Sequence, residues 1–328
     1  MNKIKIQLAT LFSFCLIVSV SFWSCNDTDY LYLPDAIKPL TVTSVSVTEA
    51  EIGDQITITG TNFSLLPSNN KVLFNTVEAE VVSATETELV VIVPNAVASG
   101  EVISTVPLTV SHGSYSANVG NFKVSKPIKT LVITLTDEND DVEEVAVLDD
   151  DPDAGVEIGT MDLASSDLEI GEVSSGQGLM NIGLRFNGVS IPEGSIISEA
   201  YIQFKTDATG SGEVEMTIYG ENTANAEAYT DVVGNLSSRA LTQANAVWNI
   251  APWENVGDRG DAQKTVNISS IVQEIINQDD WASGNSINII LKNTGVSATA
   301  TATSGGREAE NYSAWTADDG AEITIVYR

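Results

Sequence analysis

The sequence of 328 residues has few cysteines, one histidine and few basic residues, and each shortage narrows its chemistry. The cysteines are Cys15 and Cys25, and the histidine is His112. A single histidine argues against His-based catalytic triads, zinc hydrolysis and histidine general bases. Lys and Arg number 15 against 45 Asp and Glu, a net charge of −30. Because such a polyanion is repelled by nucleic acid and by anionic lipid, we expect neither as a partner.

The N-terminus joins a basic start to an apolar run that ends at a cysteine. The run, residues 8–23, is shorter than the ~20 residues that span a bilayer comfortably. Small Ser24 precedes Cys25, as signal peptidases require. This pattern resembles a bacterial lipoprotein signal, which implies removal of residues 1–24 and a lipid on Cys25. The alternative is an uncleaved N-terminal anchor.

A lipid on Cys25 would determine both where the protein is located and whether it can form a disulfide. Acyl chains bind membranes with ~0.8 kcal/mol per buried methylene, so a lipid-anchored outer-membrane protein is predicted. Residues 25–40 form the expected tether, and its acidic start at 26–29 resembles the surface-export signal of lipoproteins from Gram-negative polysaccharide degraders. We therefore expect the protein to face the cell exterior. With Cys15 removed and Cys25 acylated, no disulfide is expected.

Residues 41–124 contain short strands of alternating polarity, separated by Gly, Asn and Pro. In "QITITG", Ile56 and Ile58 would face inward while Thr57 faces water, which is typical of an all-β sandwich. The segment resembles the IPT/TIG family of immunoglobulin-like domains. That resemblance rests on "IGDQITITGTNFS" (52–64), "KVLFNTVEAEVVSATETELVVIVP" (71–94) and "GNFKV" (120–124). It implies a spacer, with Phe63 filling one end of the core.

After a predicted linker at 125–130, residues 131–328 are again rich in strands, with one helix expected at Ser270–Asn277. Long strands around one short helix indicate a jelly-roll sandwich. The segment resembles a jelly-roll module of secreted bacterial proteins, related to carbohydrate-binding modules of polysaccharide lyases. The stretches that carry this resemblance include "IGLRFNGVSIPEGSIISEAYIQFKTD" (182–207), "MTIYGENTANAEAY" (216–229) and "GGREAENYSAW" (305–315).

Acidic residues concentrate within 140–153 and recur shortly afterwards. Ca²⁺ takes six to eight oxygen ligands from carboxylates and carbonyls. Related jelly-roll modules imply one structural calcium where an early strand meets a late one. The predicted ligands are Asp141, Glu144, Asp167 and Glu169, with Glu310 as a further candidate. The alternative is a solvated acidic surface without an ion, because no EF-hand-type loop is present.

Aromatic and arginine side chains are the candidates for sugar contacts. Sugar rings stack on exposed aromatic planes, and Tyr312 and Trp315 lie in a late loop. Three other tryptophans fall inside motifs of the resemblance and are expected in the core: Trp248, Trp253 and Trp281. Arg307 is the candidate for gripping an acidic sugar. The alternative places it, like Arg185 and Arg239, in a buried ion pair with a glutamate.

The sequence contains no G-x-S-x-G, Walker or C-x-x-C motif, and nothing in it places two carboxylates across a cleft. We therefore predict a non-enzymatic surface lipoprotein that binds extracellular polysaccharide through its jelly-roll domain. Its partners would be the polysaccharide, the membrane that holds its lipid and, as further candidates, other surface proteins of a glycan-uptake system. The alternative is a structural or adhesive protein that binds a protein or matrix component.

Overall fold

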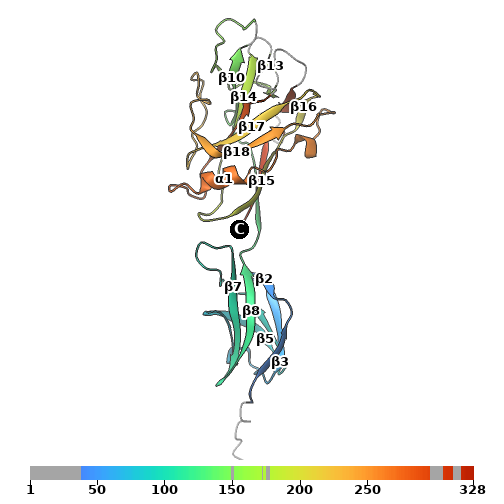
Figure 1. The fold of residues 1–328 in the computed structure, drawn as a ribbon, viewed down its shortest axis with the longest axis vertical. Coiled ribbons are helices and arrows are strands. Elements are labelled where there is room, and N and C mark those ends of the chain that lie inside the picture. The colour runs from blue at the N-terminus through green and yellow to red at the C-terminus, as the bar shows by residue number, and fades with distance from the viewer. Residues whose placement is uncertain (1–37, 149–150, 172, 175–177, 296–305, 313–318) are drawn as a thin grey trace, which may run out of the picture.

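The computed structural model describes residues 38–328, except 149–150, 172, 175–177, 296–305 and 313–318. It forms two units, each built almost entirely of strands, which lie end to end along the long axis (Figure 1). Residues 126–128 lie between the last strand of the first unit and the first strand of the second. No helix of the described ranges is long and apolar enough to cross a membrane. The predicted all-β fold class is confirmed.

The first unit is one eight-stranded sheet that curls around a core, with strand order β1-β3-β6-β5-β4-β7-β8-β2. Its only parallel pairing among the described strands joins β2 to β8. The strands are β1 (Thr41–Val45), β2 (Glu49–Glu51), β3 (Gln55–Thr61), β4 (Asn70–Phe74), β5 (Val77–Ala84), β6 (Glu88–Ile92), β7 (Ile103–His112) and β8 (Tyr115–Ser125), with a 3-10 turn at Pro67–Asn69.

Alternation within β3 builds this core as the sequence predicts. Ile56 and Ile58 are buried, and Phe63 beyond the strand closes one end of the same cluster. The bend before it requires glycine, because a Cβ on Gly60 would lie 2.1 Å from the Thr41 carbonyl oxygen and 2.5 Å from the Phe63 ring. The prediction that Phe63 fills the core end is therefore confirmed.

In its described residues, the second unit contains three antiparallel sheets and one α-helix. The largest has the order β11-β10-β14-β19-β17-β18, with β13 also on β14; the others are β12-β20-β16 and β15-β21-β9. The elements are β9 (Lys129–Thr134), β10 (Asp141–Leu148), β11 (Met161–Asp162), β12 (Asp167–Ile170), β13 (Val173–Ser174), β14 (Gly178–Phe186), β15 (Ile197–Gln203), β16 (Thr206–Ala208), β17 (Glu215–Glu221), β18 (Leu241–Asn249), α1 (Ser269–Ile276), β19 (Ile287–Asn293), β20 (Arg307–Glu310) and β21 (Glu322–Tyr327).

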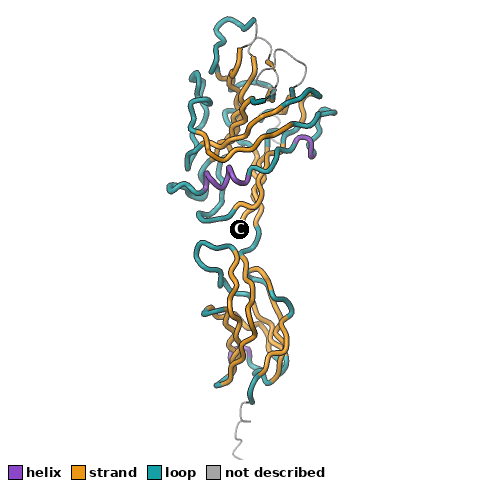
Figure 2. The backbone as a smooth tube through the Cα atoms, viewed as in Figure 1, coloured by secondary structure: helices purple, strands orange, loops and turns teal. Residues whose placement is uncertain are grey.

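One apolar cluster joins the inner faces of these sheets into a sandwich. Trp248, Trp253 and Trp281 are all buried in it, and the Phe204 ring stacks on Trp248 with centroids 5.7 Å apart. Helix α1 begins one residue before the predicted start and packs against β15 and β18 (Figure 2). The predicted helix and the predicted core tryptophans are confirmed.

The two separate cores predict independent responses to mutation. Phe122 is 2% exposed and its ring meets Phe74 edge-on, so Phe122→Ala should destabilise the first unit by about 3 to 5 kcal/mol. Every tryptophan after residue 40 lies in the second unit, so tryptophan fluorescence follows that unit while circular dichroism follows both. Denaturation should show an early circular-dichroism transition with an unchanged fluorescence midpoint.

The matched control is Val82→Ala, because Val82 is 44% exposed in the same unit and should leave both midpoints unchanged. An equal shift of the fluorescence midpoint by Phe122→Ala would mean that the units unfold as one.

Candidate functional site

The start of β10 buries four carboxyl groups within five residues. Asp140, Glu143 and Glu144 are each 1% exposed and Asp141 is 5% exposed. Removing a carboxylate from water is costly unless hydrogen-bond donors or cations replace the water. Each of these carboxyl groups therefore needs a hydrogen-bond donor, and the segments that supply the donors are held against β10.

Asp140, on the outer face of the large sheet, is held by side chains from β14 and the loop after it. Its Oδ1 accepts from Arg185 Nη1 at 2.9 Å, and its Oδ2 accepts from Asn187 Nδ2 at 2.5 Å. Arg185 also donates from Nε to the Ala226 carbonyl and from Nη2 to Ser286 Oγ. Burial raises the pKa of Asp140, and the guanidinium opposes that rise. The network fixes one wall of a pocket of about 660 Å³, described below with its lining residues.

Glu144 lies on the same outer face and caps a long loop. Its carboxylate accepts backbone N–H groups from Leu236, at 2.8 Å, and from Ser237, at 2.9 Å. Beside it, Val142 packs with Tyr229 and Leu236. The two interactions dock residues 229–237 onto the sheet.

Asp141 and Glu143 point from the opposite, inner face of β10. Asp141 Oδ2 accepts the Tyr312 N–H at 2.6 Å, and Glu143 Oε1 accepts the Glu169 N–H at 2.6 Å. Burial raises the pKa of Asp141 to about 7. Burial also raises the pKa of Glu143 well above its usual value, and the neighbouring Glu169 carboxyl raises it further.

The structure does not gather the predicted calcium ligands into one site. Strand alternation turns Glu144 to the outer face of β10 and Asp141 to the inner face, and backbone N–H groups occupy both carboxylates. Asp167 and Glu169 lie on β12 instead. The four-residue set is therefore corrected: Asp141 and Glu144 hold loops in place.

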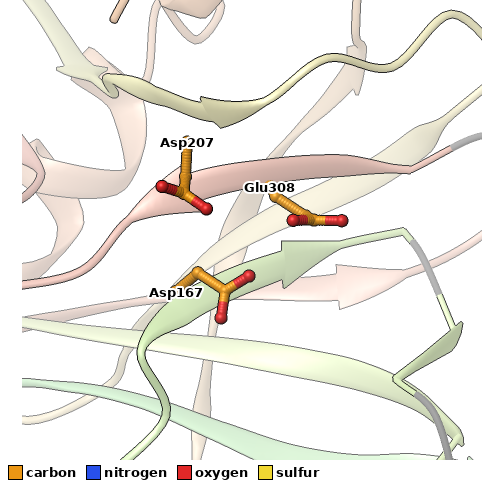
Figure 3. A group of neighbouring side chains, drawn as sticks. All are labelled: Asp167, Asp207 and Glu308. Carbon is orange, nitrogen blue, oxygen red and sulfur yellow. The ribbon is translucent and has the colours of Figure 1, made fainter. Parts of the chain in front are cut away.

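A different acidic group forms where β12, β20 and β16 pair. Oxygens of Asp167, Asp207 and Glu308 all lie within 4.8 Å of one another (Figure 3). Only Asp167 was predicted, because the pairing of β20 with both neighbours brings together residues that are far apart in the sequence. All three side chains are half-buried, and such acidic groups are common without an ion.

Arg307 is in the interior, which overturns its predicted contact with a ligand. The residue is 0% exposed. Its guanidinium donates to the carbonyls of Ala251 (2.8 Å), Gly306 (2.9 Å), Gly212 (2.9 Å) and Ile250 (3.1 Å). An ion pair of the predicted kind joins Arg239 to Glu221 at 2.7 Å, with little of either side chain exposed.

Two neighbouring open pockets are the best candidates for ligand binding. The larger, of about 660 Å³, is lined by Thr136, Asp137, Asn139, Asp140, Leu163, Arg185, Asn187, Ala228, Tyr229, Thr230 and Asp231. The smaller, of about 370 Å³, is lined by Glu138, Leu163, Ala164, Ser165, Ser166, Glu310, Asn311 and Tyr312. Leu163 borders both, and so does the segment 136–140.

Of the predicted ligand-binding residues, Tyr312 lines the smaller pocket, whereas Trp315 and the lipidation residue Cys25 lie outside the described residues. The larger pocket was not predicted from the sequence. Its walls come from four segments, 136–140, 163, 185–187 and 228–231, that no spacing in the sequence connects.

Comparison with known proteins identifies one of the two units. Residues 40–125 match the IPT/TIG domain family, as the sequence motifs predict. No curated protein matches the chain.

Several solved structures show limited similarity. A Bacteroides thetaiotaomicron protein of unknown function is 23% identical, with 33% of this chain and 28% of that chain covered and a TM-score of 0.25. An auxiliary nutrient binding protein from Bacteroides ovatus is 22% identical, with 31% and 25% covered and a TM-score of 0.21. SGBP-B from a xyloglucan utilization locus in Bacteroides uniformis is 14% identical, with 88% and 72% covered and a TM-score of 0.22.

The chain thus spans only about a quarter of the length of the first two structures. At TM-scores this low, the similarity says nothing about what this chain binds.

The capping role of Glu144 can be measured. Glu144→Leu leaves the buried Leu236 N–H and the part-buried Ser237 N–H without an acceptor and should cost about 2 to 4 kcal/mol of unfolding free energy. Glu144→Gln keeps a carbonyl oxygen at the same place and should cost clearly less. Urea denaturation followed by tryptophan fluorescence compares the two.

Glu157→Gln is the control, since Glu157 is exposed in the same unit and its change should be nearly neutral. Equal losses for the Leu and Gln variants would contradict the capping role.

Proposed function

We propose that the second unit binds an extracellular polysaccharide in the pocket of about 660 Å³, and that the IPT/TIG domain acts as its spacer. The observation that carries this proposal is the set of hydrogen-bonding side chains around the pocket. Asn139, Thr230 and Asp231 are exposed on its rim. Amide, hydroxyl and carboxylate groups of this kind match the hydroxyls of a sugar, and the volume is typical of ligand pockets.

The pocket is also held in shape before any ligand arrives. Arg185, Asn187 and Ser286 are linked to one another and to buried Asp140. A wall that is already ordered spares a ligand the entropic cost of fixing side chains. The adjoining pocket around Tyr312 offers space for further residues of a chain-like ligand.

The charge of the pocket favours an uncharged glycan. Hydrogen bonds from the Asn139 backbone and side chain lower the pKa of Asp137, which keeps that carboxylate ionised. Asp231 adds a second carboxylate, while the guanidinium of Arg185 is engaged by Asp140. An acidic polysaccharide would meet repulsion here and across a chain of net charge −30.

The remaining parts of the proposal concern location and chemistry. A lipid on Cys25 would anchor the protein in the outer membrane, facing outward, where polymeric glycans and other proteins of a glycan-uptake system are encountered. The pocket would hold its ligand without cleaving it. A structural Ca²⁺ belongs to the same proposal, with Asp167, of the ligands predicted from the sequence, lying in the acidic group with Asp207 and Glu308.

A second candidate function is adhesion to a protein or matrix component. Among the described residues, every aromatic side chain is buried or half-buried, so no aromatic platform is exposed for stacking on sugar. That observation favours a partner bound by polar contacts over a broad surface.

Glycan-array and affinity-gel measurements on the purified full chain test the choice between these functions. The double variant Asn139→Ala/Asp231→Ala should weaken binding of a recognised polysaccharide about tenfold or more, since each lost hydrogen bond contributes about 0.5 to 1.5 kcal/mol. The matched control, Asn255→Ala/Asp261→Ala, changes the same residue types on another exposed segment of the same unit and should bind normally.

Absence of binding to every neutral and acidic polysaccharide would contradict the proposal and favour adhesion. Release of shortened sugars during the assay would contradict the non-enzymatic part.

The charge argument gives a separate prediction. At low ionic strength, with chelator present, neutral polysaccharides should be retarded in affinity gels more strongly than polyuronates, because repulsion between carboxylates is least screened there. Tighter retention of a polyuronate under these conditions would contradict the argument. The chelator removes the case in which Ca²⁺ bridges two carboxylates.

A further inference from the structure

Strand β9 lies at the end of its sheet, and one of its two edges has no partner. The order β15-β21-β9 gives it β21 on one side, and among the described strands it pairs with no other. Edge strands expose a row of backbone N–H and C=O groups on which another chain can form a further strand. Strand β9 begins where the two units meet, near the C-terminus marked in Figure 1.

The neighbouring strands show which backbone groups face the open edge. Arg328 exchanges two backbone hydrogen bonds with Ile196, so along β21 the even-numbered residues bond to β15 and the odd-numbered residues bond to β9. The partners of those odd-numbered residues in β9 are Lys129, Leu131 and Ile133. Thr130, Val132 and Thr134 therefore direct their N–H and C=O groups away from the sheet, and no described residue bonds to these groups.

The side chains along β9 leave this edge open to pairing. Alternation turns Leu131 and Ile133 toward the core of the second unit. Ile128, just before the strand, is 52% exposed, and Val132 is 51% exposed. Proteins usually block such an edge with charges, a proline or a bulge. The stretch "IKTLVIT" (128–134) has Lys129 as its one charge, it contains no proline, and its pairing with β21 has no bulge.

Positive charge gathers at the start of the same strand. Lys126, Lys129 and Arg328 line one pocket of about 180 Å³, whose walls also include Glu193. Within the described part of the chain, these three cations have no ion pair. The basic residues that do have a carboxylate partner are Lys71, Lys123, Arg185, Lys205, Arg239, Arg259 and Lys264. In a chain with 45 acidic and 15 basic residues, three unpaired cations around one pocket indicate a surface for external negative charge.

We propose that the open edge of β9 binds an extended acidic segment of a protein partner, which adds to the sheet as a further strand. The backbone groups of Thr130, Val132 and Thr134 supply the hydrogen bonds, and carboxylates of the segment lie against the three cations. A second copy of this chain is a poorer occupant, because each copy carries a net charge of −30. This edge lies outside the larger pocket, so the inference does not rest on polysaccharide binding.

Selection from a phage-displayed library of random peptides, with the purified full chain as target, tests this surface. The selected peptides should alternate apolar and polar residues and carry Asp or Glu toward one end. Synthetic copies of these peptides, followed by fluorescence anisotropy, should bind more weakly as salt is added, because salt screens exposed charges.

Two variants separate the backbone edge from the cations. Val132→Pro removes an outward N–H at an edge position that tolerates proline, and it should weaken peptide binding about tenfold or more. Its matched control, Val132→Thr, keeps the N–H and should bind nearly normally. Lys126→Gln/Lys129→Gln should weaken binding about fivefold or more at low salt. Its control, Lys38→Gln/Lys71→Gln, changes two exposed lysines of the first unit and should have no effect.

Thermal melting followed by circular dichroism checks that each variant is folded, and Thr130→Pro replaces Val132→Pro if the latter is not. Failure to select any peptide, or peptide binding that neither variant changes, would overturn the proposal. Loss of binding in the lysine variant alone would also overturn it and assign an anion site of the kind an acidic glycan could occupy. Loss in the proline variant alone would contradict an acidic partner. Dimers in sedimentation that Val132→Pro abolishes would assign the edge to a second copy instead.

Discussion

The burial of carboxyl groups on β10 is the constraint on which the second unit depends. Four such groups within five residues leave water, and each buried ion costs several kcal/mol unless the protein supplies compensating contacts. The donors come from separate segments: Arg185 at the end of β14 and Asn187 just after it, Leu236 and Ser237 from the loop before β18, and Tyr312 after β20. One acidic strand thereby fixes loops that lie far apart in the sequence.

The same loops carry the walls of both candidate pockets, which links stability to function. Asp140 and Arg185 line the larger pocket directly, and Tyr312 lines the smaller one while its N–H is held by Asp141. The acidic composition of the chain thus has two physical roles. Part of it is buried inside the second unit, and part lies on the rim of the larger pocket, where in the proposed function it would favour an uncharged ligand. The IPT/TIG domain has its own core, and in the proposed function it would act as a spacer.

Features set by local periodicity could be predicted from the sequence. Alternation placed Ile56 and Ile58 inside, the apolar stripe of α1 was visible, and the three motif tryptophans are in the core. The site was harder, because its chemistry depends on which distant N–H or guanidinium reaches each carboxyl. Asp141 and Glu144 were predicted to be metal ligands. The sequence alone does not distinguish an exposed carboxylate, which can bind an ion, from a buried one that is already held by backbone N–H groups. Arg307 looked available to a ligand, but loop carbonyls more than fifty residues earlier surround it.

The central claim is that the protein's own backbone amides hold the carboxylates of β10. Hydrogen exchange measured by NMR tests it most directly at Leu236, Ser237 and Tyr312, which lie outside the strands and helices. The account predicts that these three amides exchange as slowly as those of the neighbouring strands, because each donates to a buried carboxylate. Exchange at the rate of open loops would contradict it.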